Sequence, residues 1–203
     1  MSTQLAPRGV RPWWRDAVTY QIYIRSFADS NGDGIGDVEG IRSKLGYLQK
    51  LGVDAIWITP WYPSPQNDHG YDVSDYMNIE PDYGTLKDAE RLIKDAHEHG
   101  IKVIVDIVPN HTSDQHKWFQ AALKAKPGSP ERARYIFRDG KGPNGDLPPN
   151  NWQAVFGGPA WHRIVEADGK LGQWYLHLFA VEQPDLNWEN SEVRSHFEDV
   201  LKF

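Results

Sequence analysis

The chain has 203 residues, of which 39% are hydrophobic and 25% are charged, and its formal net charge is -6. This composition is typical of a globular protein and argues against disorder as the default state. With 22 Lys plus Arg and no basic run, the chain lacks an electrostatic footprint for nucleic acid or an anionic membrane, and the absence of cysteine excludes disulfides, a thiolate nucleophile and thiolate metal sites.

The N-terminal residues lack the pattern of a targeting signal. Residues 1–16, MSTQLAPRGVRPWWRD, contain no continuous apolar segment and no small-residue cleavage site. A run of about 18 apolar residues, which a membrane span would need, occurs nowhere in the sequence. The sequence therefore predicts a cytoplasmic protein.

Three buried strands are predicted in the first half of the chain. Each is short, apolar and rich in β-branched or aromatic residues: 18–24 (VTYQIYI), 55–60 (AIWITP) and 102–108 (KVIVDIV). Helical spacing of apolar residues predicts helices at 38–52 and 86–100, which end at Gly52 and Gly100. This alternation predicts right-handed βαβ units, a parallel sheet buried on both faces and an α/β fold.

The second half of the chain has a different character. A stretch rich in Pro, Gly, Asn and Trp runs from residue 111 to residue 187, and segments such as QWYLHLF (173–179) could form antiparallel strands. This stretch predicts an inserted subdomain. The segment 191–203 then predicts a helix with Ser191 as its N-cap and with Val193, Phe197, Val200 and Leu201 in helical phase.

The segment from Asp29 to Asp37, DSNGDGIGD, alternates oxygen-bearing side chains with small residues. Such a loop can curl around one hard cation, calcium or magnesium. Its first half resembles an EF-hand loop, but that loop needs a bidentate Glu at its twelfth position, where Gly40 stands. Two interpretations remain, a cation site or an ordinary Asp/Gly turn between a strand and a helix.

Polar residues follow the second and third predicted strands. Asp68 and Tyr71 lie in DHGYD (68–72), and His111 follows the third strand. Ligands of parallel α/β sheets bind beyond the carboxyl ends of the strands, so these side chains should face one cleft. The alternative is a solvated loop with a capping Asp and a histidine that is satisfied by hydrogen bonds at a strand end.

Two further features are expected to border this cleft. Asp106 lies in an apolar strand, and a buried carboxylate must be paired or hydrogen-bonded, so it is interpreted as structural support for a site and not as a base. The segment 179–187, FAVEQPDLN, could fold back over the same cleft. Taken by itself, it is also consistent with a loop that leads into a helix.

Three ordered motifs together resemble the family 13 glycoside hydrolases, the α-amylase family. They are GVDAIWITP (52–60), DIVPNHTS (106–113) and QPDLN (183–187), and the resemblance runs from Trp13 to the last residue. QPDLN and the DSNGDGIGD loop favour the α-glucosidase and oligo-1,6-glucosidase branch. The resemblance implies the first three βα units of a TIM (β/α)8 barrel, incomplete in this chain, with an inserted subdomain after the third strand.

By this resemblance, residues 1–110 form the N-terminal part of the barrel, 111–187 the inserted subdomain and 188–203 the third barrel helix, cut short. The family's site residues map onto Asp68, Tyr71 and His111, which would bind the glucosyl unit, with Phe179 and Gln183 at the border of that pocket. A structural calcium or magnesium ion would be held by Asp29, Asn31, Asp33, the Ile35 carbonyl and Asp37. Position 69 departs from the pattern, because it is His where relatives often carry Asn.

The resemblance also implies a retaining mechanism, with a nucleophilic carboxylate and an acid/base carboxyl about 5 Å apart. In the family the nucleophilic Asp follows the fourth strand in a GxRxD context and the acid Glu follows the fifth, and no GxRxD occurs in these 203 residues. We therefore expect a chain that is inactive alone, from a parent enzyme that acts on the α-glucosidic bonds of oligosaccharides.

Two other classes of protein fit parts of this pattern. A non-catalytic relative that serves as an accessory subunit of amino-acid transporters would carry a membrane span before the barrel. A free-standing sugar- or cation-binding module would retain affinity for glucose or calcium without turnover.

Overall fold

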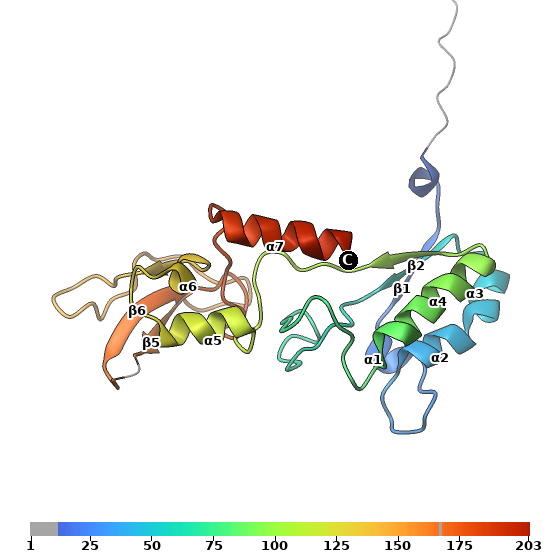
Figure 1. The fold of residues 1–203 in the computed structure, drawn as a ribbon, viewed down its shortest axis with the longest axis horizontal. Coiled ribbons are helices and arrows are strands. Elements are labelled where there is room, and N and C mark those ends of the chain that lie inside the picture. The colour runs from blue at the N-terminus through green and yellow to red at the C-terminus, as the bar shows by residue number, and fades with distance from the viewer. Residues whose placement is uncertain (1–11, 167) are drawn as a thin grey trace, which may run out of the picture. The chain divides into compact units, whose positions relative to one another are not determined.

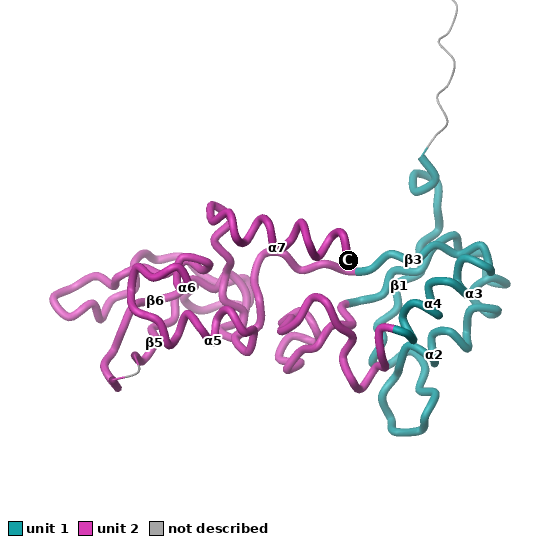
Figure 2. Tube along the Cα trace, in the orientation of Figure 1, with its two compact units in different colours: residues 1–59, 87–105 teal, residues 60–86, 106–203 magenta. Residues whose placement is uncertain are grey.

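The computed structural model describes residues 12–166 and 168–203. These residues form two compact units, shown in Figure 2. Unit 1 consists of the described residues up to Thr59 together with Lys87–Val105, and unit 2 consists of Pro60–Leu86 and Asp106–Phe203. This division differs from the predicted one at residues 1–110, 111–187 and 188–203, because the long loop after the second strand and the C-terminal helix group with the inserted subdomain.

Unit 1 is built on a three-stranded parallel sheet in the order β1-β2-β3. The strands are β1 (Thr19–Ile22), β2 (Ala55–Ile58) and β3 (Lys102–Val105), all within the predicted segments but shorter than them. Ile56 pairs with Tyr20 on one side and with Val103 on the other. The predicted parallel βαβ arrangement is therefore confirmed.

Helices cover one side of this sheet, as Figure 1 shows. They are α2 (Val38–Ser43), α3 (Leu45–Leu51) and α4 (Leu86–Glu98), preceded by the short η1 (Trp13–Arg15) and α1 (Ile24–Phe27). The single helix predicted at 38–52 is two helices, because a tight turn at Lys44 ends α2 and begins α3. Gly52 ends α3 in the left-handed conformation with φ of 82°, as its position after the last apolar residue predicted.

The core of unit 1 lies between these helices and the sheet. Ile41, Leu45 and Leu48 are buried, whereas Leu51, the last residue of α3, is 53% exposed. The prediction of a sheet buried on both faces is wrong for the described residues, since Thr19 and Gln21 of β1 are exposed and so are Ile104 and Val105 of β3.

Unit 2 contains a second sheet, antiparallel and in the order β4-β6-β5. The strands are β4 (Phe137–Arg138), β5 (Trp161–Val165) and β6 (Leu171–Leu176), which confirms antiparallel pairing in the predicted insertion. Two short helices that periodicity had not indicated precede it, α5 (Lys117–Lys124) and α6 (Pro130–Ala133).

The C-terminal helix α7 (Ser191–Lys202) also belongs to unit 2. Its N-cap is Asn190 and not Ser191, because the Asn190 side chain accepts a hydrogen bond from the backbone N–H of Glu192. Val193 and Phe197 are buried, whereas Leu201 is 74% exposed. In the part of the chain that the structure covers, no helix combines the length and apolar character needed to cross a membrane.

Candidate functional site

The loop that carries Asp68 and Tyr71 is organised around the buried carboxylate of Asp72. Its oxygens accept hydrogen bonds from Ser64 Oγ at 2.9 Å, the backbone N–H of Asn67 at 2.9 Å and that of Asp68 at 3.1 Å. Asp72 is fully buried. Sequence reasoning missed this role, because an Asp in a polar loop gives no signal that it folds inward.

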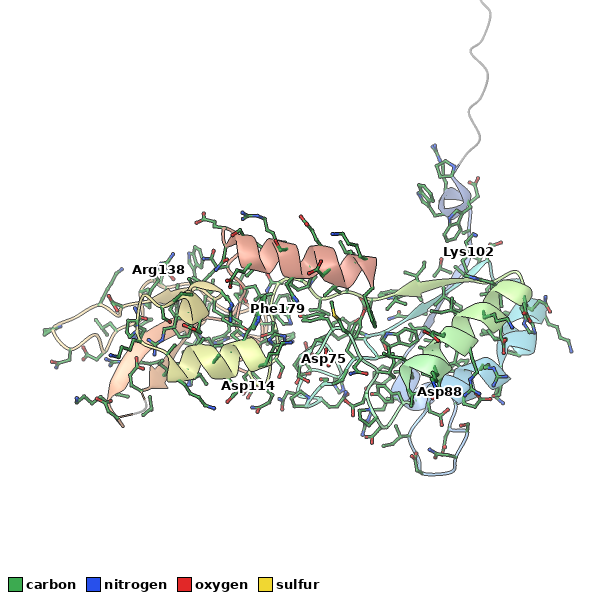
Figure 3. All side chains as sticks on the ribbon, in the orientation of Figure 1. Asp75, Asp88, Lys102, Asp114, Arg138 and Phe179 are labelled. Atoms are coloured by element: carbon green, nitrogen blue, oxygen red, sulfur yellow. The ribbon has the colours of Figure 1, made fainter. Side chains whose placement is uncertain are left out.

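The structure brings the predicted site residues of unit 2 together. Gln183, fully buried, donates from Nε2 to Asp68 Oδ2 at 2.8 Å, and the same nitrogen lies 3.0 Å from His111 Nε2. His111 Nε2 is also 3.1 Å from the Tyr71 carbonyl oxygen. The ring of Phe179, which Figure 3 labels, lies 5.0 Å from that of His111 between centroids. Segments far apart in sequence therefore form one cluster of polar groups with aromatic neighbours.

Asp106 contacts this cluster through Tyr71. The Tyr71 hydroxyl donates to Asp106 Oδ2 at 3.0 Å, and the Tyr62 hydroxyl donates to the Asp106 carbonyl at 2.9 Å. Burial and the neighbouring Asp106 carboxylate raise the pKa of Tyr71 to about 12, so its phenol stays protonated as a donor. Asp106 thus orients a tyrosine of the cluster, which fits a supporting role.

Two buried titratable groups set the electrostatics of the cluster. Burial lowers the pKa of His111, so that its ring is neutral at neutral pH. Burial also raises the pKa of Asp185 to about 6. Hydrogen bonds from the Leu178 N–H and from Asn110 lower this pKa, but their effect is smaller than that of burial. Above that pH Asp185 is a buried anion held by polar donors.

Phe156 extends the aromatic part of the cluster and was not singled out from the sequence. Its ring packs edge-on against that of Phe179, with an interplanar angle of 67° and centroids 5.9 Å apart, and the residue is 62% exposed. The high aromatic content of the chain was the only sequence signal, and it did not distinguish this ring from the others.

The loop from Asp29 to Asp37 lies in unit 1 and is closed by its own hydrogen bonds. Asp29 accepts from the backbone N–H of Gly32 at 2.7 Å and of Gly34 at 2.9 Å, and these bonds lower the pKa of Asp29. The donor types suit a hard cation. However, among the described residues no three acidic or histidine side chains gather into a group that could hold a metal ion.

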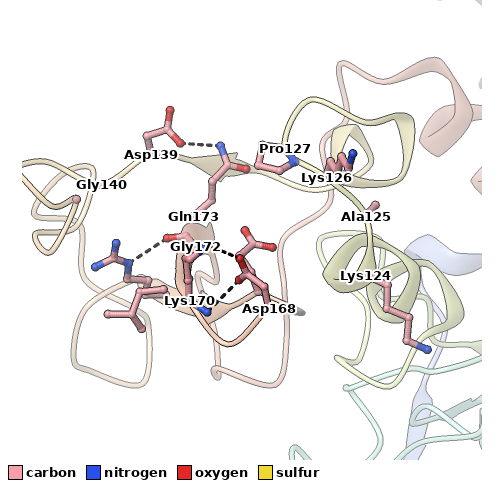
Figure 4. Close-up of a pocket in the computed structure, with 14 residues that line it drawn as sticks. Lys124, Ala125, Lys126, Pro127, Asp139, Gly140, Asp168, Lys170, Gly172 and Gln173 are labelled. Atoms are coloured by element: carbon pink, nitrogen blue, oxygen red, sulfur yellow. Dashed lines mark hydrogen bonds and ion pairs between the residues drawn. The ribbon is translucent and has the colours of Figure 1, made fainter.

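A cavity of about 750 Å³ opens elsewhere in unit 2, beside β6 (Figure 4). None of the predicted site residues lines it. Its polar groups pair with one another, since Lys170 Nζ lies 2.8 Å from Asp168 Oδ2 and Gln173 donates to Asp139 at 2.9 Å. Size alone therefore does not make this cavity the functional site, and the cluster around His111 remains the candidate.

Comparison with known proteins places this geometry in a family. Residues 21–203 match the model of the alpha-amylase catalytic domain. The chain belongs to the alpha-amylase family. This result confirms the resemblance drawn from the three motifs and identifies the parallel βα units of unit 1 as a part of the β/α barrel of that family.

Relatives within the alpha-amylase family include glycoside hydrolases of the α-glucosidase type. The chain is 52% identical over 193 residues to the probable oligo-1,6-glucosidase 3 of Bacillus subtilis, and 52% identical over 192 residues to the trehalose-6-phosphate hydrolase of the same organism. Each alignment covers 95% of this chain and 33% of the relative. The chain thus spans about a third of the length of these proteins.

A solved structure gives the same result. The trehalose-6-phosphate hydrolase of Bacillus licheniformis superposes with a TM-score of 0.88 at 51% sequence identity, over 95% of this chain and 34% of that one. At this identity the likeness extends beyond the general fold to the sequence.

Proposed function

We propose that the protein is a retaining α-glucosidase of the alpha-amylase family, and that this chain supplies part of the pocket for the glucosyl unit at the bond to be cleaved. The observation that carries the proposal is the convergence of Asp68, His111 and Gln183. The Nε2 atom of Gln183 lies within hydrogen-bond distance of both the Asp68 carboxylate and the His111 ring nitrogen Nε2.

This set of groups is suited to a sugar. Each hydroxyl of a pyranose both donates and accepts, so a carboxylate beside two N–H donors can bind adjacent hydroxyls. The ring faces of Tyr71 and Phe179 add apolar surface against which the C–H groups of a pyranose can stack. Phe156, next to Phe179 and largely exposed, extends that surface toward solvent.

The carboxylates of this cluster are assigned to binding and support and not to bond cleavage. Asp68 is bonded to Gln183, Asp106 to Tyr71, and Asp185 is buried against Leu178. A retaining mechanism needs a nucleophilic carboxylate and a protonated carboxyl about 5 Å apart. Because no GxRxD segment occurs in the 203 residues, the proposal places both groups outside them and expects no turnover by this chain alone.

The test is an assay with p-nitrophenyl α-glucoside. The 203-residue chain and a longer product of the same reading frame would be purified and compared, and only the longer product is expected to release nitrophenol. Turnover by the 203 residues themselves would contradict the proposed location of the nucleophile.

A variant of the active form tests the assignment of Asp68. Asp68→Asn removes a charged acceptor, and its kcat/KM should fall roughly 10- to 100-fold. Asp139→Asn, which changes an exposed carboxylate bonded to Gln173, is the matched control and should leave kcat/KM unchanged. Equal kcat/KM values for the two variants would show that Asp68 does not bind the substrate.

The proposal includes a structural calcium or magnesium ion bound to the loop Asp29–Asp37. The residues that would hold it are Asp29, Asn31, Asp33, Asp37 and, through its carbonyl, Ile35. All of these donors are oxygens, the ligands that both cations prefer, and the bound ion would neutralise the carboxylates and stiffen the loop. Nothing in this role involves the ion in bond cleavage.

Thermal and urea unfolding with EDTA, calcium chloride or magnesium chloride test this site. A cation at 100 times its Kd should raise the free energy of unfolding by about 2.7 kcal/mol. Asp33→Ala should abolish the increase, whereas Asp82→Ala, at an exposed position of the loop 61–85, should retain it. Identical unfolding curves in EDTA and in either cation would mean that the loop is an Asp/Gly turn.

A further inference from the structure

Asp185, Asn110 and His111 form a line of side chains that ends in the sugar-binding cluster. Asn110 Nδ2 lies 3.1 Å from Asp185 Oδ1 and 3.2 Å from His111 Nδ1. The backbones of His111 and Asp185 are paired in an isolated antiparallel bridge, which fixes the two segments against each other. Of these three residues, only His111 has a role in the proposed function.

Several hydrogen bonds hold Asp185 in place. It is 4% exposed, and its Oδ1 accepts the backbone N–H of Leu178 at 3.0 Å in addition to Asn110. Its own N–H donates to the Leu176 carbonyl at 2.9 Å. A buried carboxylate is stable only with such donors, so removal of Asn110 would leave part of its charge unsatisfied.

The ionised Asp185 fixes the orientation of the Asn110 amide. A carboxylate only accepts hydrogen bonds, so the amide must turn its NH₂ and not its oxygen toward Asp185. The second proton of that NH₂ is then available to His111 Nδ1 at 3.2 Å. A ring nitrogen that accepts a hydrogen bond carries no proton, and a neutral imidazole then carries its single proton on Nε2.

One of the two contacts of His111 Nε2 requires this proton position. The Tyr71 carbonyl, 3.1 Å away, can only accept, so it requires a proton on Nε2. The Gln183 amide cannot turn its oxygen toward the ring, because that oxygen accepts the Ala180 N–H at 2.9 Å while the nitrogen donates to Asp68. With the proton on Nε2, the 3.0 Å approach of Gln183 Nε2 and His111 Nε2 joins two N–H donors and is not a hydrogen bond. This contact opposes the Nε2–H tautomer, whereas the Tyr71 carbonyl and the Asn110 donor at Nδ1 favour it.

We propose that Asp185 is a positioning residue that acts through Asn110 to hold the proton of His111 on Nε2. The inference rests on the proposed function in one respect, because the purpose of the fixed proton is to give the sugar two adjacent donors that one hydroxyl oxygen can accept together. With the proton on Nδ1, His111 would offer an acceptor at that point and repel the Tyr71 carbonyl.

The test is nitrogen NMR of the protein labelled with ¹⁵N-histidine, at pH 7.5 so that Asp185 is ionised. The two ring nitrogens report directly which of them carries the proton, and a His111→Gln variant assigns the signals. The wild-type protein should show His111 as the Nε2–H tautomer alone. A proton on Nδ1, or a mixture, would overturn the proposal without any variant.

Variants test whether Asp185 and Asn110 are the cause. In Asp185→Asn the amide of Asn110 is no longer fixed, and in Asn110→Ala the donor is gone, so the Nδ1–H tautomer should become populated in both. Asn187→Ala is the matched control, because Asn187 belongs to the same QPDLN segment but donates to the Ala133 carbonyl. Variants that fold and keep pure Nε2–H would show that Asn110 does not set the proton.

Titration with methyl α-glucoside separates this inference from the proposed function. The sugar should shift the His111 signals, and Asp185→Asn should weaken its binding roughly five- to tenfold. If the wild-type protein has the Nε2–H tautomer but its His111 signals do not respond to the sugar, the sugar site is contradicted and the role of Asp185 in fixing the proton still stands. If the His111 signals respond to the sugar but show the Nδ1–H tautomer, the sugar site is supported and the role of Asp185 is contradicted.

Discussion

His69 adopts the left-handed region of backbone conformation, with φ of 52°, between two residues that shape the site loop. Gly70, which follows it, has φ of 98° and its Cα faces the Pro60 carbonyl so closely that an added Cβ would lie 3.0 Å from that oxygen. The left-handed region is open to Asn, Asp and His at lower cost than to other side chains, and to glycine without penalty. The departure from Asn at position 69 therefore keeps a residue that tolerates this conformation.

Substitution of His69 tests this reading. His69→Val places a β-branched residue at positive φ and should lower the free energy of unfolding by about 1–2 kcal/mol, whereas His69→Asn should leave it within about 0.5 kcal/mol of wild type. Urea unfolding of the three proteins measures both. A valine variant as stable as the asparagine variant would mean that the loop relaxes to another conformation.

Two glycines in neighbouring helices have opposite roles at the scale of secondary-structure elements. Gly40 in α2 packs against the backbone of Ala28, and a Cβ there would meet the Ala28 carbonyl oxygen at 1.9 Å. Gly46 in α3 faces open space with nothing within 4 Å. The first glycine allows the loop 29–37 to close onto α2, and the second has no packing reason to lack a side chain.

This difference predicts stability changes of opposite sign. Gly40→Ala should lower the free energy of unfolding by about 3 kcal/mol, because the backbones must move apart. Gly46→Ala should raise it by about 0.5–1 kcal/mol, because alanine restricts the unfolded chain and favours the helix. Denaturant unfolding of both variants checks the prediction, and a shift of the same sign in both would contradict it.

His116 connects the start of α5 with α7 and the site loop. It is 1% exposed, and its Nδ1 accepts the backbone N–H of Trp118 at 3.1 Å as the N-cap of α5. Its ring lies 6.2 Å from those of Tyr76 and His196 between centroids. Burial, with the nearby His196 and Lys117, lowers the pKa of His116 to about 4 despite the opposing charge of Asp75.

This arrangement predicts loss of stability in acid. The folded pKa lies below the unfolded value of 6.5, so the stabilisation is complete above about pH 6.5 and is lost as the pH falls toward 4. The loss should reach at most about 3 kcal/mol. His116→Asn keeps a capping side chain without a titrating ring, so its free energy of unfolding should fall less between pH 7 and pH 5 than that of wild type.

Urea unfolding at the two pH values measures the effect, with His97→Asn as the control. His97 is an exposed histidine of α4, and its replacement should leave the pH dependence unchanged. Asp185, whose pKa is raised, changes the free energy of unfolding with pH in the opposite direction. This effect is the same in all three proteins and cancels when their pH dependences are compared. Parallel pH profiles of wild type and His116→Asn would contradict the role of His116.

At the scale of the whole molecule, the parallel sheet has an open edge in the described residues. β3 pairs with β2, and no strand of the described chain pairs with its other side. Ile104 and Val105 of this strand are 39% and 36% exposed. An exposed apolar strand edge is a template for pairing with another chain, so the 203-residue chain should self-associate as its concentration rises.

A charge on this strand should suppress the association. Sedimentation velocity over a range of concentrations should show larger species for the wild-type chain and fewer for Ile104→Lys. Tyr47→Lys, which changes a 57% exposed aromatic on α3, is the control and should not reduce association. A wild-type chain that is monomeric at all concentrations would show that the edge is protected.

Local patterns were sufficient to predict much of the fold and which residues lie together around His111. Apolar runs located β1, β2 and β3, helical spacing located α4, and Gly52 ended α3 where predicted. The motifs also named the residues that the structure brings together around His111. They did not predict the turn at Lys44, the cap by Asn190 or the burial of Asp72, because these depend on local backbone geometry and on partners that periodicity does not encode.

The sequence by itself thus determined the α/β class, the family and most members of the cluster around His111, since strand and helix periods and short motifs are local properties of the chain. Only the tertiary structure decided how those residues interact. Gln183 reaches Asp68 across 115 positions of sequence, and Asp185 meets Asn110 across 75. The partners of buried polar groups, and with them pKa values and proton positions, are set by contacts between distant segments, and these exist only after the chain has folded.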